Sequence, residues 1–180
     1  MLIVFTLVLM VLSWRASAMV GLLAHELAHA GMGRLVGLPI REIRLGEGRT
    51  LIEQRIGAMV VRIGWRWRGG TVRLDPNVAM GKVALSLFIA AGPCANLMLF
   101  AALLWVIAAD EIDRDWIGLI LPAAACQFAT LVRTLKPGEH LLFGQRIPND
   151  GAVLLELLSG KSDAAVMPPH RASGFETRGK

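Results

Sequence analysis

The chain has 180 residues, of which 54% are hydrophobic and 18% are charged, and its formal net charge is +5. This composition is too apolar for an ordinary soluble domain and predicts a membrane protein. Arginines cluster at residues 34–73, beside apolar segments, which favours a cytoplasmic membrane face over a nucleic-acid-binding surface. We therefore expect the lipid bilayer as a partner and no nucleic acid.

Three apolar segments are long enough to cross a bilayer, whose hydrocarbon core of about 30 Å requires about 20 helical residues. They predict transmembrane helices at residues 2–31, 83–109 and 116–132. The first segment resembles the apolar part of a signal peptide, but no basic segment precedes it and the apolar pattern continues past Arg15. We therefore expect it to be retained, in a mainly α membrane protein with about three transmembrane helices.

The segment 40–74, between the first two expected helices, has a different pattern. Apolar and polar residues roughly alternate there, Val, Ile, Thr and Trp are common, and glycines stand at 46, 48, 69 and 70. This pattern predicts two to four short strands with turns at these glycines. The result would be a small strand-rich loop that is cytoplasmic or associated with the membrane.

The chain after the third helix is interrupted by proline and glycine. Residues 136–159 predict a loop and a broken helix, whose apolar part begins near residue 152, and the polar residues 161–180 predict a disordered cytoplasmic tail. We find no internal repeat and no second soluble domain, so residues 1–160 are expected to form one core. Basic residues follow the first and third helices and acidic residues join the second to the third. The positive-inside rule then predicts a multi-pass protein of the cell membrane, with its N-terminus outside and its C-terminus in the cytoplasm.

The sequence AHELAHA, residues 24–30, places two histidines and a glutamate inside the first apolar segment. His25 and His29 lie one helical turn apart on the same face, so their imidazoles can bind one metal ion. Glu26 has the position of the general base in HExxH sites. The alternative is a chance match or histidines held by core hydrogen bonds. Ionisable residues in a membrane helix cost about 2–3 kcal/mol each, which favours the metal site.

A catalytic zinc ion requires three protein ligands and an open position. The other histidines are His140 and His170, and His170 lies in the expected disordered tail. Asp150, in the sequence PNDG, stands at the head of an apolar helix on the same side of the membrane as His25. An aspartate there is also a good helix N-cap, and spacing alone does not decide between the two roles.

Three motifs in this order resemble the site-2 proteases, the intramembrane zinc metalloproteases of peptidase family M50. They are HELAH at 25–29, AAGPCAN at 90–96 and PNDG at 148–151. The resemblance covers roughly residues 15–160, most of the chain. It implies that the loop 40–74 meets the substrate as an added strand.

The resemblance also implies roles for individual residues. One zinc ion would be bound by His25, His29 and Asp150, and Glu26 would be the catalytic base. The second helix would present to the site a family element that comprises Gly92, Pro93 and Asn96.

One departure from the family concerns the approach to Asp150. The family carries Asn-x-x-Pro shortly before its metal-binding aspartate, whereas this chain has TLKP at 134–137. Thr134 lacks the amide, so substrate or oxyanion contacts are expected to come from Asn96 or Asn149. We expect no PDZ-like or nucleotide-sensing regulatory domain beside the core, so control over substrate entry would come from a regulatory partner or from the core itself.

The function that follows is hydrolysis of peptide bonds in or near the transmembrane segments of membrane protein substrates. The alternative is a non-proteolytic zinc-binding membrane protein that binds partner helices, but such a site has no need of Glu26. A metal transporter would carry ionisable residues along a path through the membrane, and the second and third helices supply almost none.

Other residues in the apolar segments carry smaller expectations. Arg15 shares a helical stripe with Glu26 and His29, so it would pair with an acidic residue among 110, 111 and 113 or line a hydrated cavity. The alternative is that its guanidinium extends outward to the membrane surface. Cys94 and Cys126 are expected to pack in the core.

Overall fold

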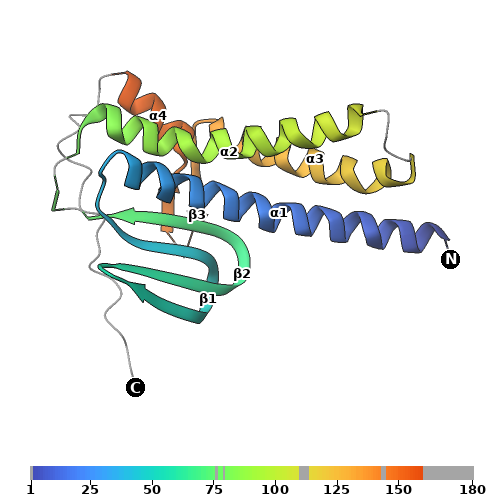
Figure 1. Ribbon diagram of the computed structural model, residues 1–180, viewed down its shortest axis with the longest axis horizontal. Helices are drawn as coiled ribbons and strands as arrows, with labels where there is room; N and C mark the ends of the chain where they lie inside the picture. The colour runs from blue at the N-terminus through green and yellow to red at the C-terminus, as the bar shows by residue number, and fades with distance from the viewer. Residues whose placement is uncertain (1, 76, 79, 110–113, 143–144, 160–180) are drawn as a thin grey trace.

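The computed structural model describes residues 2–75, 77–78, 80–109, 114–142 and 145–159. Its elements are α1 (Leu2–Leu35), β1 (Ile40–Ile56), β2 (Met59–Leu74), α2 (Lys82–Ala108), α3 (Arg114–Leu135), β3 (Glu139–Leu142), β4 (Gln145–Pro148) and α4 (Asp150–Leu158). The three long helices run side by side, and the β1–β2 sheet lies beside one end of α1 (Figure 1). The expected tail, residues 161–180, lies outside the described residues.

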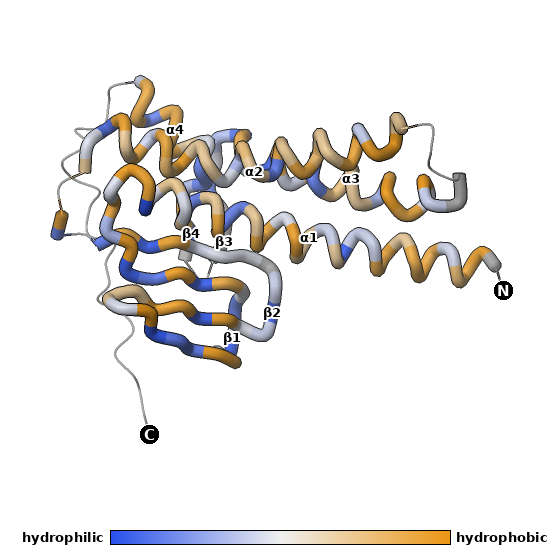
Figure 2. Tube along the Cα trace, in the orientation of Figure 1, coloured by the Kyte–Doolittle hydropathy of each residue, from blue (hydrophilic) through white to orange (hydrophobic). Residues whose placement is uncertain are grey.

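The helices α1, α2 and α3 are each long and apolar enough to cross a membrane, which confirms a mainly α protein with three candidate spans. Apolar residues run along all three helices (Figure 2). Many of their side chains are exposed, including Ile3 at 76%, Met98 at 73% and Trp105 at 75%. A surface of this kind requires an apolar environment, which the hydrocarbon core of a bilayer provides.

The first helix continues past its expected end at residue 31. Gly37 has φ +75° and stops the helix, because glycine adopts this left-handed conformation without a steric penalty. The backbone N–H of Leu38 then donates to the carbonyl of Gly33 at 2.7 Å, the bond of a Schellman cap. Leu38 itself is buried against α2, so the end of α1 is held in place by packing.

The sheet consists of two long, bent strands in place of several short ones. β1 and β2 pair antiparallel with repeated register shifts, so that Ile43 has Val72 as a partner on one side and Val61 on the other. Positive φ angles of 80° at Gly46 and 78° at Gly48 accompany the bend of β1 at the expected turn. Among the described residues, the segment 70–74 pairs on one side only and is therefore an edge of the sheet (Figure 1).

The sheet is attached to α1 by its apolar face. Ile43, Leu45 and Met59 form a buried cluster with Ala30, which lies directly after the HELAH motif. The polar face carries Arg62, which donates to Glu42 at 3.0 Å and to Glu53 at 2.9 Å. This packing places the 70–74 edge next to the motif.

The segment after α3 was expected to be a loop, and this expectation is wrong. Residues 139–142 and 145–148 form an antiparallel hairpin, with Glu139 opposite Pro148 and Leu142 opposite Gln145. The hairpin leads into α4, whose Leu157 is buried against Leu85, Phe88 and Ile89 of α2. The end of the chain that carries Asp150 is therefore fixed to the helix bundle.

Two minor expectations have different outcomes. Arg15 is exposed and has no ion pair among the described residues, while its expected partners at 110, 111 and 113 lie outside them. Cys126 is buried as expected, but Cys94 is exposed on α2.

Candidate metal centre

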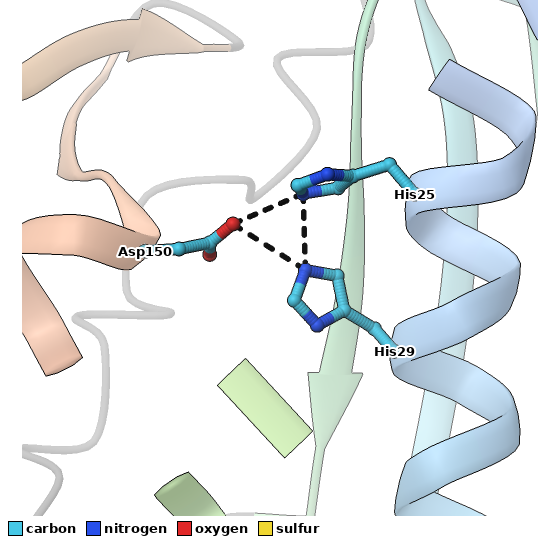
Figure 3. A group of neighbouring side chains, drawn as sticks. All are labelled: His25, His29 and Asp150. Carbon is cyan, nitrogen blue, oxygen red and sulfur yellow. Dashed lines mark hydrogen bonds and ion pairs between the residues drawn. The ribbon is translucent and has the colours of Figure 1, made fainter. Parts of the chain in front are cut away.

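The structure brings together the three residues that the sequence analysis assigned as ligands. His25 and His29 project from α1 and Asp150 projects from the start of α4 toward them (Figure 3). The Nε2 atoms of the histidines are 3.0 Å apart, and Oδ2 of Asp150 lies 3.0 Å from the first and 3.5 Å from the second. A tetrahedral zinc ion with bonds of about 2.0–2.1 Å has ligand atoms about 3.3 Å apart. The three atoms therefore fit such an ion.

The ring of His29 is oriented by a backbone carbonyl of α2. Its Nδ1 lies 2.6 Å from the carbonyl oxygen of Phe88 and donates to it, which leaves the lone pair of Nε2 directed at the cluster. Pro93 has no N–H and leaves the adjacent carbonyl of Ile89 without its helical donor. The proline of the AAGPCAN motif thus lies next to the turn of α2 that orients His29, and it is buried in the helix.

The ring of His25 is oriented by Asn96. Nδ2 of Asn96 lies 3.0 Å from Nδ1 of His25, and the Asn96 side chain is completely buried. When Oδ1 faces the ring, Nδ1–H donates to it and Nε2 is free to bind a metal; amide oxygen and nitrogen exchange places by a simple rotation. As placed, Oδ1 has no hydrogen-bond partner among the described residues, which favours this exchange. The contact with His25 is therefore the hydrogen bond that the structure shows for this amide, and it orients the His25 ring.

Gly92 allows the two histidines to lie directly against α2. A Cβ atom at this position would be 2.6 Å from Nε2 of His25 and would also collide with Nε2 of His29. Only glycine leaves room for both rings. The second-helix motif therefore contributes space at Gly92 and a polar contact at Asn96, one turn later on the same face.

Asp150 is free to face the histidines because another residue caps its helix. The N-cap of α4 is Asn149, whose side chain accepts from the backbone N–H of Ala152 at 3.0 Å. Burial opposes ionisation of Asp150, but its close contacts with His25 and His29 outweigh it and hold the pKa of the carboxyl below its usual range. The group is thus the carboxylate that a metal requires.

Asn149 was a candidate for substrate or oxyanion contact, and its hydrogen bonds indicate a different use. Its Nδ2 donates to the carbonyls of Arg133 at 2.9 Å and Lys136 at 2.6 Å. Its Oδ1 accepts from Gly138 at 3.2 Å as well as from Ala152. Both amide hydrogens are occupied by protein carbonyls, so Asn149 joins the end of α3 to the start of α4.

Glu26 lies in a cleft of about 290 Å³ that also contains the ligand cluster. The side chain is 5% exposed, and its Cγ atom would be 2.6 Å from a Cβ added at Gly70. The backbone of the sheet edge therefore passes directly over the glutamate. Other residues that line the cleft come from α3 and β4. They are Thr130, Arg133, Thr134, Ile147 and Pro148.

The residue in place of the family asparagine, Thr134, lines the cleft but uses its hydroxyl hydrogen within α3. Its Oγ1 donates to the carbonyl of Thr130 at 2.8 Å. His140, the alternative ligand, belongs to β3, but its side chain is outside the described part of the structure, as is His170.

Two parts of the cleft were not assigned from the sequence. Arg133 at the end of α3 and Trp67 before the sheet edge both line it. The adjacent glycines 69 and 70 lie within β2 and not in a turn, and the absence of a side chain at Gly70 admits the backbone to Glu26.

A bundle of membrane-length helices with a His–His–Asp cluster and a buried glutamate in one cleft defines a membrane-embedded protein with a metallopeptidase-type site. A family model described as peptidase family M50 matches residues 16–167. The chain belongs to this family, a family of metallopeptidases of the site-2 type, which confirms the resemblance of its three motifs. A comparison with curated protein sequences finds no match.

Proposed function

We propose that this chain is an intramembrane zinc metalloendopeptidase that hydrolyses peptide bonds in or near transmembrane segments of other membrane proteins. The observation that carries the proposal is the presence of His25, His29, Asp150 and Glu26 in a single cleft beside a helix long enough to cross a membrane. Membership in peptidase family M50 supports the same reaction class.

Zinc bound by His25, His29 and Asp150 would act as a Lewis acid toward the peptide carbonyl and increase the acidity of water. Glu26 is the proton carrier of the reaction. Its carboxylate accepts a proton as the hydroxyl of water adds to the carbonyl carbon, and it returns the proton to the nitrogen as the C–N bond breaks. Its position under Gly70 places this carboxylate beneath the backbone of the sheet edge.

The edge at 70–74 is the surface on which we place the substrate. A transmembrane helix must unwind before its carbonyls are accessible, and an unwound segment needs new hydrogen-bond partners. The unpaired side of an edge strand supplies them by β-augmentation. The glycines at 69 and 70 line the cleft, so an added strand could approach Glu26 without a side chain between them.

In the membrane, we place the N-terminus of α1 outside and the sheet and α4 on the cytoplasmic side. The arginines of β1 and β2 support this orientation, because basic residues favour the cytoplasmic face. The substrate helix would enter from the bilayer, and a partner protein would control its access.

The decisive experiment compares purified wild-type protein with Glu26→Gln and Asp150→Ala, using cleavage of candidate membrane proteins and zinc content as readouts. We expect Glu26→Gln to reduce cleavage by about 10²–10⁴-fold while zinc is retained, because a general base contributes about this factor. Asp150→Ala should lose both zinc and cleavage. The matched control is Glu156→Gln, an exposed glutamate on α4.

Cleavage by Glu26→Gln at the wild-type rate would refute the proposal and favour a non-proteolytic zinc protein. Full zinc content and activity in Asp150→Ala would exclude Asp150 as a ligand, and His140 would be tested next.

A further inference from the structure

A line of polar contacts joins α1 to α3. On α1 it precedes the ligands His25 and His29, whereas Ala30 follows them. The hydroxyl of Ser13 donates to the carbonyl of Leu119, and the hydroxyl of Ser17 donates to the carbonyl of Ala123 at 3.0 Å. Nε2 of Gln127 donates to the carbonyl of Ser17 at 2.7 Å and to its hydroxyl at 2.8 Å. The contacts advance by four residues on each helix. We call this set the α1–α3 seam, formed by Ser13, Ser17, Gly21, Leu119, Ala123 and Gln127.

Gln127 is the most deeply placed polar group of the seam. Its side chain is 1% exposed, and its Oε1 has no hydrogen-bond partner among the described residues. Burying an amide in this way is costly, so simple packing does not account for it. The amide lies over Gly21, where an added Cβ would be 2.6 Å from Oε1 and 2.7 Å from Nε2. The side-chain amide of Gln127 therefore occupies the space that a side chain at position 21 would fill.

The seam is aligned with the metal ligands. Its α1 positions 13, 17 and 21 continue at the same spacing to His25 and His29, so His25 lies one turn, about 6 Å, beyond Gly21. The other end of the ligand set is tied to α3, because Asn149, the neighbour of Asp150, donates to the carbonyl of Arg133. The axial position of α1 relative to α3 thus determines how His25 meets Asp150.

We propose that Gln127 is a positioning residue for the metal centre: its amide, seated over Gly21, holds α1 in register with α3 so that His25 faces Asp150. The inference rests on the proposed metal site. It assigns Gln127 no contact with substrate or metal.

The test measures Co²⁺ binding to the purified full-length protein by its absorption spectrum and by competition with a chelator. The variants are Gln127→Ala, Gly21→Ala and the double variant. Each single variant should weaken Co²⁺ binding about tenfold, the lower end of the range for residues that orient metal ligands. The double variant should bind no more weakly than Gln127→Ala, because the new methyl group then meets no amide.

The matched control is Ser13→Ala, which removes a seam contact three turns before His25 and should leave Co²⁺ affinity within about twofold. The same proteins without metal are compared by thermal unfolding, since a general loosening of the helices lowers that temperature for Ser13→Ala as well. If Gln127→Ala does not fold, Gln127→Met, which keeps the length of the side chain, and Gly21→Ala carry the test.

Wild-type Co²⁺ affinity in the Gln127 and Gly21 variants would overturn the inference. Independent losses that multiply in the double variant would overturn it too, as would an equal loss in Ser13→Ala. His25→Ala separates this result from a failure of the metal site itself. If His25→Ala binds Co²⁺ as the wild type does, the proposed metal centre is wrong. If His25→Ala loses Co²⁺ binding while the Gln127 and Gly21 variants bind normally, only the role of Gln127 is contradicted.

Discussion

Gly92→Ala is the substitution for which the structure predicts the most specific effect on the metal centre. The new Cβ would lie 2.6 Å from Nε2 of His25, whereas ordinary contact begins at 3.4 Å. His25 must therefore move by about 0.8 Å, and His29, which is closer still, must move as well. Ligand positions need to be held within about 0.5 Å for a functional site. Both histidines would leave that range.

The expected loss of zinc affinity is about 100-fold, which corresponds to about 2.7 kcal/mol. The fold should tolerate the change better than the site does, because alanine is favoured over glycine inside a helix by about 1 kcal/mol. Displacement of the rings also strains their contacts with the Phe88 carbonyl and Asn96. The result should be a protein that remains folded but binds zinc weakly.

The assay is chelator competition for zinc on purified protein, with thermal unfolding of the metal-free form as the measure of folding. Gly31→Ala is the matched control, because it is the same substitution two residues beyond His29 on α1, where an added Cβ meets nothing within 4 Å. It should bind zinc normally. Wild-type zinc affinity in Gly92→Ala would refute the reasoning that places both imidazoles against α2.

Two further substitutions test the proposed catalytic base and the support of the proposed third ligand separately. Gly70→Ala should keep zinc but lower turnover at least tenfold, because its Cβ would lie 2.8 Å from Oε1 of Glu26 and displace the carboxylate; Gly81→Ala, in open space, is the control, and unchanged turnover would contradict this placement of the sheet edge. Asn149→Ala should destabilise the protein by about 2 kcal/mol and weaken zinc binding, since it removes the cap of α4 and two bonds to the end of α3. Ser159→Ala, with one exposed side-chain bond, is its control, and an unchanged unfolding temperature with normal zinc affinity would count against the role of Asn149.

The membrane helices were predictable because hydropathy and length are local properties of the sequence. Their ends were less so. The first helix was expected to end at residue 31, yet Gly31 lies within α1, and the helix stops before Gly37 with φ +75°. Which glycine takes a positive φ depends on what can pack after it, in this case Leu38 against α2. That information is spread over distant parts of the chain.

The two histidines were predictable for the same reason, since a spacing of four residues places them on one helical face. Asp150 was ambiguous because both aspartate and asparagine cap helices well, and PNDG contains one of each. The structure separates them by their contacts, with Asn149 on the backbone of α4 and Asp150 on the histidines. The hairpin of β3 and β4 was missed because each strand has only four residues and one contains proline.

The α1–α3 seam shows why a motif for metal binding does not describe the whole of its helix. Ser13, Ser17 and Gly21 look like small residues that permit close packing, and nothing near them in sequence indicates Gln127. With Gln127 over Gly21, one stripe of α1 carries the contacts with α3 in its first half and the candidate metal ligands in its second. At the proposed metal site, association of α1 with α3 and metal binding would depend on the same axial register. Each process would then stabilise the other by linkage, so a change that shifts the helices would also shift the ligands.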